Sequence, residues 1–365
     1  MKIATITCHD VYNYGASLQA YALQHYLESK GHQVDIIDYK PPYLSGHFSL
    51  TAVSGRYNKP IIKQLYLIAK LYGRLKRFSK KHSFDAFTSK FLKLSSVQYN
   101  SVEQLRANPP KADVYIAGSD QIWNTILPNG HDAAFYLDFG KSVRKISYAA
   151  SFATDAIFNG ATKFVTDKLK NFDSISVRES SAVNLCNSLG RDDAALVCDP
   201  VFLLNKEQWD VLASLPKNLP EKIILVYDCE IGDRLKPLAK ILAHHYNAKI
   251  VAINFPKKYA DFNLPNIGPC EFLGLIAGAT AIISNSFHAT AFSIIYQKDF
   301  YVVPRSENLN SRMSDFLKYL GLGNRLTAFK SESSLQIEAI DYTGAQERLN
   351  ELIRCSKDFL NSEIR

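Results

Sequence analysis

Short apolar runs alternate along the chain with longer segments that have helical periodicity. The runs are rich in β-branched residues, and they predict strands at residues 2–7, 33–39, 112–117, 146–151, 174–177, 195–198, 222–227, 249–254, 280–283 and 300–303. Helical periodicity is clearest at residues 16–30, 180–189 and 344–364. Because the strands alternate with helices, we predict an α/β fold with mostly parallel sheets and right-handed crossovers.

The length of 365 residues exceeds what one hydrophobic core usually organises, so two domains are expected. A stretch with prolines at both ends, residues 200–220, divides the predicted strands into two groups. We therefore expect two Rossmann-like domains that face a cleft, at residues 1–204 and 205–342. The last helix, within residues 343–365, is free to cross back to the first domain.

The composition is that of an ordinary globular protein, with 47% hydrophobic and 21% charged residues. The six cysteines are scattered and form no CxxC pair, which favours a reducing compartment and neither a zinc site nor a disulfide framework. The apolar start of the chain is interrupted at His9 and Asp10, too early for a signal peptide. No apolar stretch in the sequence approaches the roughly 20 residues that span a bilayer. We expect a soluble, cytoplasmic protein that binds no metal.

The formal net charge of +8 is concentrated in one segment. No acidic residue lies between Asp38 and Asp85, although ten lysines and arginines do. Within an expected basic helical insertion at residues 56–95, apolar and basic side chains take opposite faces. Such a helix either contacts an anionic membrane surface through residues 59–81 or packs on its own domain with its lysines in solvent. Nucleic acid is not an expected partner, because no binding motif accompanies the charge.

The most informative segment directly follows the predicted strand 280–283. Residues 284–293 read SNSFHATAFS, so His288 lies where a strand ends and a helix begins, close to Ser286. In parallel α/β sheets, ligands collect at this edge, where helix N-termini present free N–H groups and partial positive charge. A titratable imidazole there suits proton transfer beside an anion. The alternative is a helix-capping serine beside a structural histidine.

Three further loops fall at predicted strand ends. The first begins a helix, offers hydrogen-bonding groups and lacks the GxGxxG fingerprint of dinucleotide sites; its candidate residues are Asn13, Tyr14, Gly15 and Ser17. The second suits a sugar, through polar contacts and an aromatic face; its candidates are Ser119, Asp120, Gln121 and Trp123. Its alternative is a helix-capping aspartate followed by a core tryptophan. The third carries Arg178, which either binds a phosphate or carboxylate or pairs with Glu179 on the surface.

Six segments of the chain, in order, read NYGASLQAYAL from residue 13, GSDQIWN from 118, YAASF from 148, SVRE from 176, DPVFLL from 199 and SFHAT from 286. Together they resemble the polysaccharide pyruvyl transferase family. The resemblance implies a glycosyltransferase-B-like pair of Rossmann domains, with the acceptor on the first and the donor on the second. It also implies transfer of a pyruvyl group from phosphoenolpyruvate to a sugar, carried on a lipid, of a bacterial surface polysaccharide, with formation of a cyclic ketal. Some members carry a phosphate-binding arginine where this chain has Ser286.

Ketal formation from an enol phosphate needs a general acid, cations for the donor anions and an acceptor for the hydroxyl protons, and no redox cofactor. His288 is the expected general acid, and Asp120 is the expected proton acceptor. Arg178 is the first candidate for the donor anions, followed by Lys298 and Arg305, which flank the predicted strand 300–303. A nucleotide-sugar glycosyltransferase and a non-catalytic sugar-binding protein of polysaccharide assembly remain the alternatives.

Overall fold

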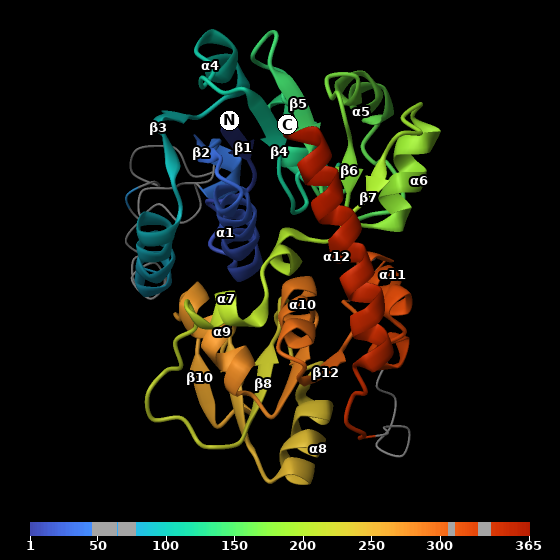
Figure 1. Ribbon diagram of the computed structural model, residues 1–365. Helices are drawn as coiled ribbons and strands as arrows, with labels where there is room; N and C mark the ends of the chain where they lie inside the picture. Colours follow the sequence, from blue (N-terminus) through green and yellow to red (C-terminus); the bar gives the residue numbers. More distant parts are fainter. Residues whose placement is uncertain (46–63, 65–77, 306–310, 328–336) are drawn as a thin grey trace.

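The computed structural model describes residues 1–45, 64, 78–305, 311–327 and 337–365. Two sheets of five parallel strands each form the centres of two domains, one above the other in Figure 1. This arrangement confirms the predicted α/β class with two Rossmann-like domains.

The first sheet has the strand order β3-β2-β1-β4-β5. Its strands are β1 (Lys2–Ile6), β2 (Gln33–Tyr39), β3 (Leu94–Tyr99), β4 (Val114–Ala117) and β5 (Arg144–Ser147). The central strands β1 and β4 are buried on both faces, which explains why they read as continuous apolar runs rather than alternating ones. The helices of this part are α1 (Tyr14–Ser29), α2 (Pro42–Ser45) and α4 (Val102–Ala107).

Beyond β5 the first domain continues through a small parallel sheet. It consists of β6 (Ser176–Val177) and β7 (Ala195–Leu196), accompanied by α5 (Thr162–Leu169) and α6 (Ser180–Ser188). Isolated bridges from Ile146 to Ser174 and from Ala150 to Val177 attach it to the edge of the main sheet. The chain therefore carries Arg178, directly after β6, to the same sheet edge at which β1 and β4 end.

The second sheet has the order β10-β9-β8-β11-β12. Its strands are β8 (Ile223–Tyr227), β9 (Lys249–Ile253), β10 (Phe262–Leu264), β11 (Ala281–Ser284) and β12 (Asp299–Val302), and its helices are α8 (Lys236–Tyr246), α9 (Pro269–Gly278) and α10 (Phe287–Ile295). In Figure 1, α9 and α10 lie on the side of the second domain that faces α1 of the first.

Two segments join the domains. One is the 3₁₀ turn η5 (Pro200–Leu203) with α7 (Lys206–Asp210), and the other is α12 (Thr343–Glu363), which follows α11 (Ser311–Leu320). Figure 1 shows α12, in red, running from the second domain to the first. On the first domain, Ser356 Oγ of α12 accepts from the backbone N–H of Cys198 at 2.8 Å, and Glu363 pairs with Arg144.

Aromatic side chains fill the contact between the domains. Tyr14 of α1 stacks on Phe272 of α9, with ring centroids 4.7 Å apart and an interplanar angle of 2°. Tyr227 and Phe84 also lie against Tyr14, at centroid distances of 5.4 and 5.3 Å. Because buried aromatic side chains dominate the energetics of cores and interfaces, separating the two domains would expose this cluster to water at a large cost in free energy.

The sequence prediction missed two edge strands and misplaced one boundary. β3 and β10 are short and mostly exposed or half-buried, so neither has an apolar run to announce it. β3 also begins inside the expected insertion 56–95, whose described end is a helix at residues 78–91. Most of the expected membrane-contact segment 59–81 lies outside the described residues. Every helix in the described part of the chain is too short or too polar to cross a bilayer.

Candidate active site

A cavity of about 260 Å³ opens between the domains at the carboxyl ends of both sheets. The first domain contributes residues that follow β1, β2 and β4, and the second contributes residues that follow β11 and β12. Its lining residues are Cys8, Val11, Asn13, Leu44, Asp120, Gln121, Leu127, Asn129, Ser286, Phe287, His288 and Arg305. The cavity thus combines apolar wall, amide groups, one carboxylate, one imidazole and one guanidinium.

His288 lies in the first turn of α10. The helix begins there because Ser286 is its N-cap, with a side-chain oxygen that accepts from the backbone N–H of Ala289 at 3.5 Å. The His288 side chain is 7% exposed, and its Nε2 lies 3.5 Å from Oδ2 of Asp199. An imidazole thus stands beside the positive end of a helix and a buried carboxylate, at the wall of the cavity.

Gly15 makes room for this imidazole from the opposite domain. It is the second residue of α1, whose N-cap Asn13 accepts from the backbone N–H of Gly15 at 2.9 Å. A Cβ atom at position 15 would stand 1.9 Å from Nδ1 of His288 and 2.1 Å from its Cγ. Glycine is therefore required here because the histidine ring occupies the space of a side chain.

Arg178 is buried and ion-paired, and its role as a ligand of the donor anions stays a prediction. Its side chain is 1% exposed, and Nη1 donates to Oδ2 of Asp199 at 2.5 Å. Asp120 and Glu179 each lie 3.6 Å from another guanidinium nitrogen, so Glu179 is a buried neighbour and not a surface partner. Facing three carboxylates, and outside the cavity lining, Arg178 organises the wall behind the cavity.

Asp199 was not among the residues selected from the sequence, yet it lies between Arg178 and His288. It follows β7, its side chain is fully buried, and its two oxygens receive Arg178, Ser119 and the backbone N–H of Val201. Burial disfavours its charged form, yet His288 and Arg178 outweigh burial and hold the pKa of Asp199 well below its usual range. The sequence did contain a signal for Asp199, because Asp199 and Pro200 directly follow the predicted strand 195–198. The other candidate loops were selected because they follow predicted strands in the same way.

Asp120 reaches the cavity through an unusual backbone. Its φ of +75° is in the left-handed region, and its carbonyl oxygen accepts from the N–H groups of Ile122 and Ser151 at 2.8 and 3.2 Å. Aspartate tolerates this conformation better than most residues, and strain of this kind persists only where surrounding bonds hold it. Its neighbour Ser119 is buried between Asp199 and Arg178, whereas Gln121 lines the cavity.

Arg305 is the cation that the described structure places on the cavity wall. It follows β12, and its Nε donates to the carbonyl oxygen of Asn285 at 3.1 Å. The Asn285 side chain is itself fixed, because Nδ2 donates to Asp228 at 2.8 Å and Oδ1 accepts from the N–H of Cys229 at 2.7 Å. Asp228 in turn forms a buried pair with Lys257 at 2.6 Å. This chain of contacts fixes the backbone to which Arg305 is anchored.

Besides Gly15, Ser119 and Arg178, which lie directly behind the cavity wall, four further predicted site residues lie outside the cavity lining. Trp123 is fully buried in the first domain, where it stacks on Tyr136 and its indole N–H donates to the carbonyl oxygen of Phe135 at 3.0 Å. The core alternative is therefore the correct one, and Trp123 offers no face to a sugar. Tyr14 packs between the domains, and Ser17 is buried in α1. Lys298 immediately precedes β12, at the end of the strand opposite to Arg305.

The sequence model of the polysaccharide pyruvyl transferase family matches residues 13–307, most of the chain. The chain belongs to this family. The match includes both sides of the cavity, from Asn13 on the first domain to Arg305 on the second. Among curated proteins, none matches the sequence of this family member.

Solved structures resemble this pyruvyl transferase family member in fold. A putative UDP-N-acetylglucosamine 2-epimerase from Listeria monocytogenes aligns with a TM-score of 0.54 at 9% identity, over 97% of this chain and 90% of the epimerase. A heptosyltransferase from E. coli aligns with a TM-score of 0.38 at 12% identity, over 84% of this chain and 90% of the heptosyltransferase. At such identities the likeness to the epimerase concerns the fold alone, an α/β fold with two Rossmann-like domains as expected.

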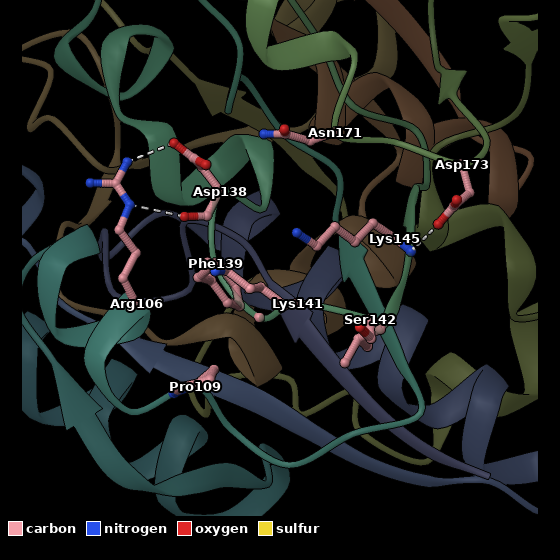
Figure 2. Close-up of a pocket in the computed structure, with 11 residues that line it drawn as sticks. Arg106, Pro109, Asp138, Phe139, Lys141, Ser142, Lys145, Asn171 and Asp173 are labelled. Carbon is pink, nitrogen blue, oxygen red and sulfur yellow. Dashed lines mark hydrogen bonds and ion pairs between the residues drawn. The ribbon is translucent and has the colours of Figure 1, made fainter.

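A larger cavity, of about 810 Å³, lies at the other edge of the first sheet. Figure 2 shows its wall, where Arg106 pairs with Asp138 and the backbone N–H of Lys145 donates to Asp173. This cavity lies near the amino end of β5, whereas α/β proteins bind ligands at the carboxyl ends of their strands. In the described part of the chain, no group of three or more His, Cys, Asp and Glu side chains is arranged to hold a metal ion.

Proposed function

We propose that this family member transfers the pyruvyl group of phosphoenolpyruvate to two hydroxyls of one sugar in a bacterial surface polysaccharide precursor, forming a cyclic ketal. The observation that carries the proposal is the cavity between the domains, where the His288 imidazole, the Arg305 guanidinium and the Asp120 carboxylate meet. These are the acid, the cation and the proton acceptor that the reaction requires.

The reaction begins with protonation of the donor. His288 gives a proton to the methylene carbon of phosphoenolpyruvate, which becomes a methyl group and leaves positive charge on the carbon that bears the phosphate. One sugar hydroxyl adds to that carbon, the phosphate leaves with its bonding electrons, and the second hydroxyl closes the ring. One of the two hydroxyl protons returns to His288. Asp120 accepts the other proton and passes it to the departing phosphate.

The donor anions belong beside the second domain. Arg305 supplies a fixed positive charge, and the N-terminus of α10 adds the partial charge of unpaired backbone N–H groups. Ser286, in the place where some family members carry an arginine, offers a hydroxyl that already caps α10. The charge that this position lacks is therefore supplied by Arg305, whose guanidinium reaches the same cavity from the end of β12.

The sugar belongs beside the first domain. Asn13, Gln121 and Asn129 provide amide groups there, and Leu44 and Leu127 provide apolar wall. Amides recognise hydroxyls by hydrogen bonds, and apolar wall contacts the carbon face of a sugar ring. This set replaces Trp123, the aromatic face expected from the sequence, as the surface on which a sugar can rest.

The test is incubation with phosphoenolpyruvate and a synthetic or lipid-linked galactoside, followed by measurement of phosphate release and product mass. We expect phosphate release coupled to an acceptor that gains one pyruvyl ketal, and loss of turnover by about 10²- to 10⁴-fold in a folded His288→Gln protein. A parallel arm supplies nucleotide sugars. Glycosyl transfer in that arm, with no phosphate released from phosphoenolpyruvate, would overturn the proposal in favour of a glycosyltransferase.

A further inference from the structure

Asp199 contacts both the Arg178 guanidinium and the His288 imidazole. Its Oδ2 lies 2.5 Å from Nη1 of Arg178 and 3.5 Å from Nε2 of His288. The carboxylate is fully buried, and its Oδ1 accepts from the N–H of Val201 at 3.1 Å, which fixes it at the start of η5. A carboxylate held from two sides presents a fixed negative charge to the imidazole.

The two ring nitrogens of His288 have different surroundings. Nε2 is buried and makes no hydrogen bond with any described residue, and Asp199 is the group that it faces. His288 nevertheless lines the cavity, so the nitrogen through which it can reach a ligand is Nδ1. Nδ1 lies over Gly15, where a Cβ atom would stand only 1.9 Å away. The ring is therefore oriented between a carboxylate on one side and a bare backbone on the other.

We propose that Asp199 is a positioning residue that holds Nε2–H of His288, so that the proton transferred in the reaction is carried on Nδ1. The inference rests on the proposed function for the reaction itself but not for the orientation of the ring. At 3.5 Å the two atoms are within ion-pair distance but are not hydrogen-bonded, and catalytic contacts that are long in a free enzyme often tighten when a ligand binds.

The proton balance follows from this orientation. In the imidazolium both nitrogens carry protons, Nε2–H toward Asp199 and Nδ1–H toward the donor. Transfer of the Nδ1 proton to the methylene carbon leaves the neutral Nε2–H tautomer, whose remaining N–H still faces the carboxylate. A proton from a sugar hydroxyl then restores Nδ1–H. The carboxylate never takes a proton, because it stabilises the charged ring that forms before each transfer.

Other charged groups surround the pair without replacing Asp199. Arg178 binds the same Oδ2 atom, and Asp120 and Glu179 lie 3.6 Å from Arg178. Arg305 and the Cys8 thiol share the cavity wall with His288. Among the described residues, Asp199 is the carboxylate within ion-pair distance of the imidazole.

The first test is the tautomer of His288 in the wild-type protein, measured by ¹H–¹⁵N correlation spectra with the signal assigned by comparison with His288→Gln. We expect the neutral ring to be the Nε2–H form. An Nδ1–H form would overturn the proposal. Because this measurement uses no substrate, it stands or fails independently of whether phosphoenolpyruvate is turned over.

The second test is Asp199→Asn, which retains the shape of the side chain and removes its charge. We expect kcat to fall about 10- to 1000-fold with KM for phosphoenolpyruvate nearly unchanged, and the alkaline limb of the kcat profile to move to lower pH. Asp38→Asn is the matched control, because Asp38 forms another buried histidine pair, with His9 at 3.1 Å, outside the cavity lining. Wild-type kcat and an unmoved pH profile in Asp199→Asn would refute the positioning role.

Discussion

Substitution of Gly15 by alanine tests the fit between the two domains. The new Cβ atom would stand 1.9 Å from Nδ1 of His288. Carbon and nitrogen atoms in contact are about 3.5 Å apart, so the ring or the helix must move by the difference, about 1.6 Å. The imidazole has little freedom to yield, because it is buried and Asp199 stands beside Nε2.

Displacement of this size should act on the reaction far more than on the fold. A misplacement of about 1 Å can cost about 10²-fold in rate, so we expect Gly15→Ala to lower kcat at least about 10²-fold. Overpacking costs about 1–3 kcal/mol, whereas alanine in place of glycine within a helix stabilises by about 0.5–1 kcal/mol. The free energy of unfolding should therefore fall by no more than about 2.5 kcal/mol.

The assay is phosphate release from phosphoenolpyruvate under saturating acceptor, with urea unfolding of the same samples. Gly344→Ala is the matched control: Gly344 is the second residue of α12, as Gly15 is of α1, and its Cβ would meet Arg348 at an ordinary 3.5 Å. We expect Gly344→Ala to keep wild-type kcat. A wild-type kcat in Gly15→Ala would refute the reasoning, and an equal fall in both variants would show that it is not specific to His288.

Three further predictions address other parts of the structure. Arg305→Gln should raise KM for phosphoenolpyruvate about 10- to 100-fold, because a charged hydrogen bond contributes about 1.5–3 kcal/mol, whereas Lys298→Gln, at the far end of β12, should leave KM unchanged. Trp123→Ala should lower the free energy of unfolding by about 3–5 kcal/mol in urea without changing KM of the folded protein, and a changed KM would return Trp123 to the site. The pKa of Asp199 is depressed below 3.8 because its cationic partners outweigh burial, so its stabilising contribution is complete above that pH and is lost as the pH falls. The difference in unfolding free energy between wild type and Asp199→Asn should accordingly stay constant at neutral pH and shrink as the pH falls below about 3.8, and a difference that stays constant in this acid range would contradict the linkage.

The sequence predicted those features of the structure that depend on residues close together in the chain. β1, β8 and β11 were predictable because parallel strands that are buried on both faces read as nearly continuous apolar runs. The position of His288 was predictable for a related reason, since a strand end followed by a helix start is recognisable in the sequence. β3 and β10 were not, because an exposed edge strand depends on pairing with a neighbour rather than on its own side chains.

Contacts between residues that are far apart in the chain could not be predicted from the local sequence pattern. Arg178 and Asp199 stand at two predicted strand ends, and nothing local distinguishes an arginine that meets a carboxylate 2.5 Å away from one that awaits a phosphate. Trp123 posed the same problem, because an indole suits both a sugar and a core, and only the packing of Tyr136 and Phe152 against it decides. Gly15 was a candidate because it lies in a loop that begins a helix, whereas the space it leaves for a side chain of the other domain is a tertiary property.

The histidine ring and the two residues that hold it are inherited in separate parts of the chain. Gly15 and Asp199 lie in the first half of the chain, before the second sheet begins, whereas His288 lies in α10 of the second domain. Consider a chimera that joins the first half of one family member to the second half of another. We expect such a chimera to fold but to lack activity unless the parent of its first half has a glycine at the position of Gly15 and an acid at that of Asp199. Diversification of the sugar-facing half is thus constrained by the chemistry of the other half, and successful chimeras should be those whose parents share this trio.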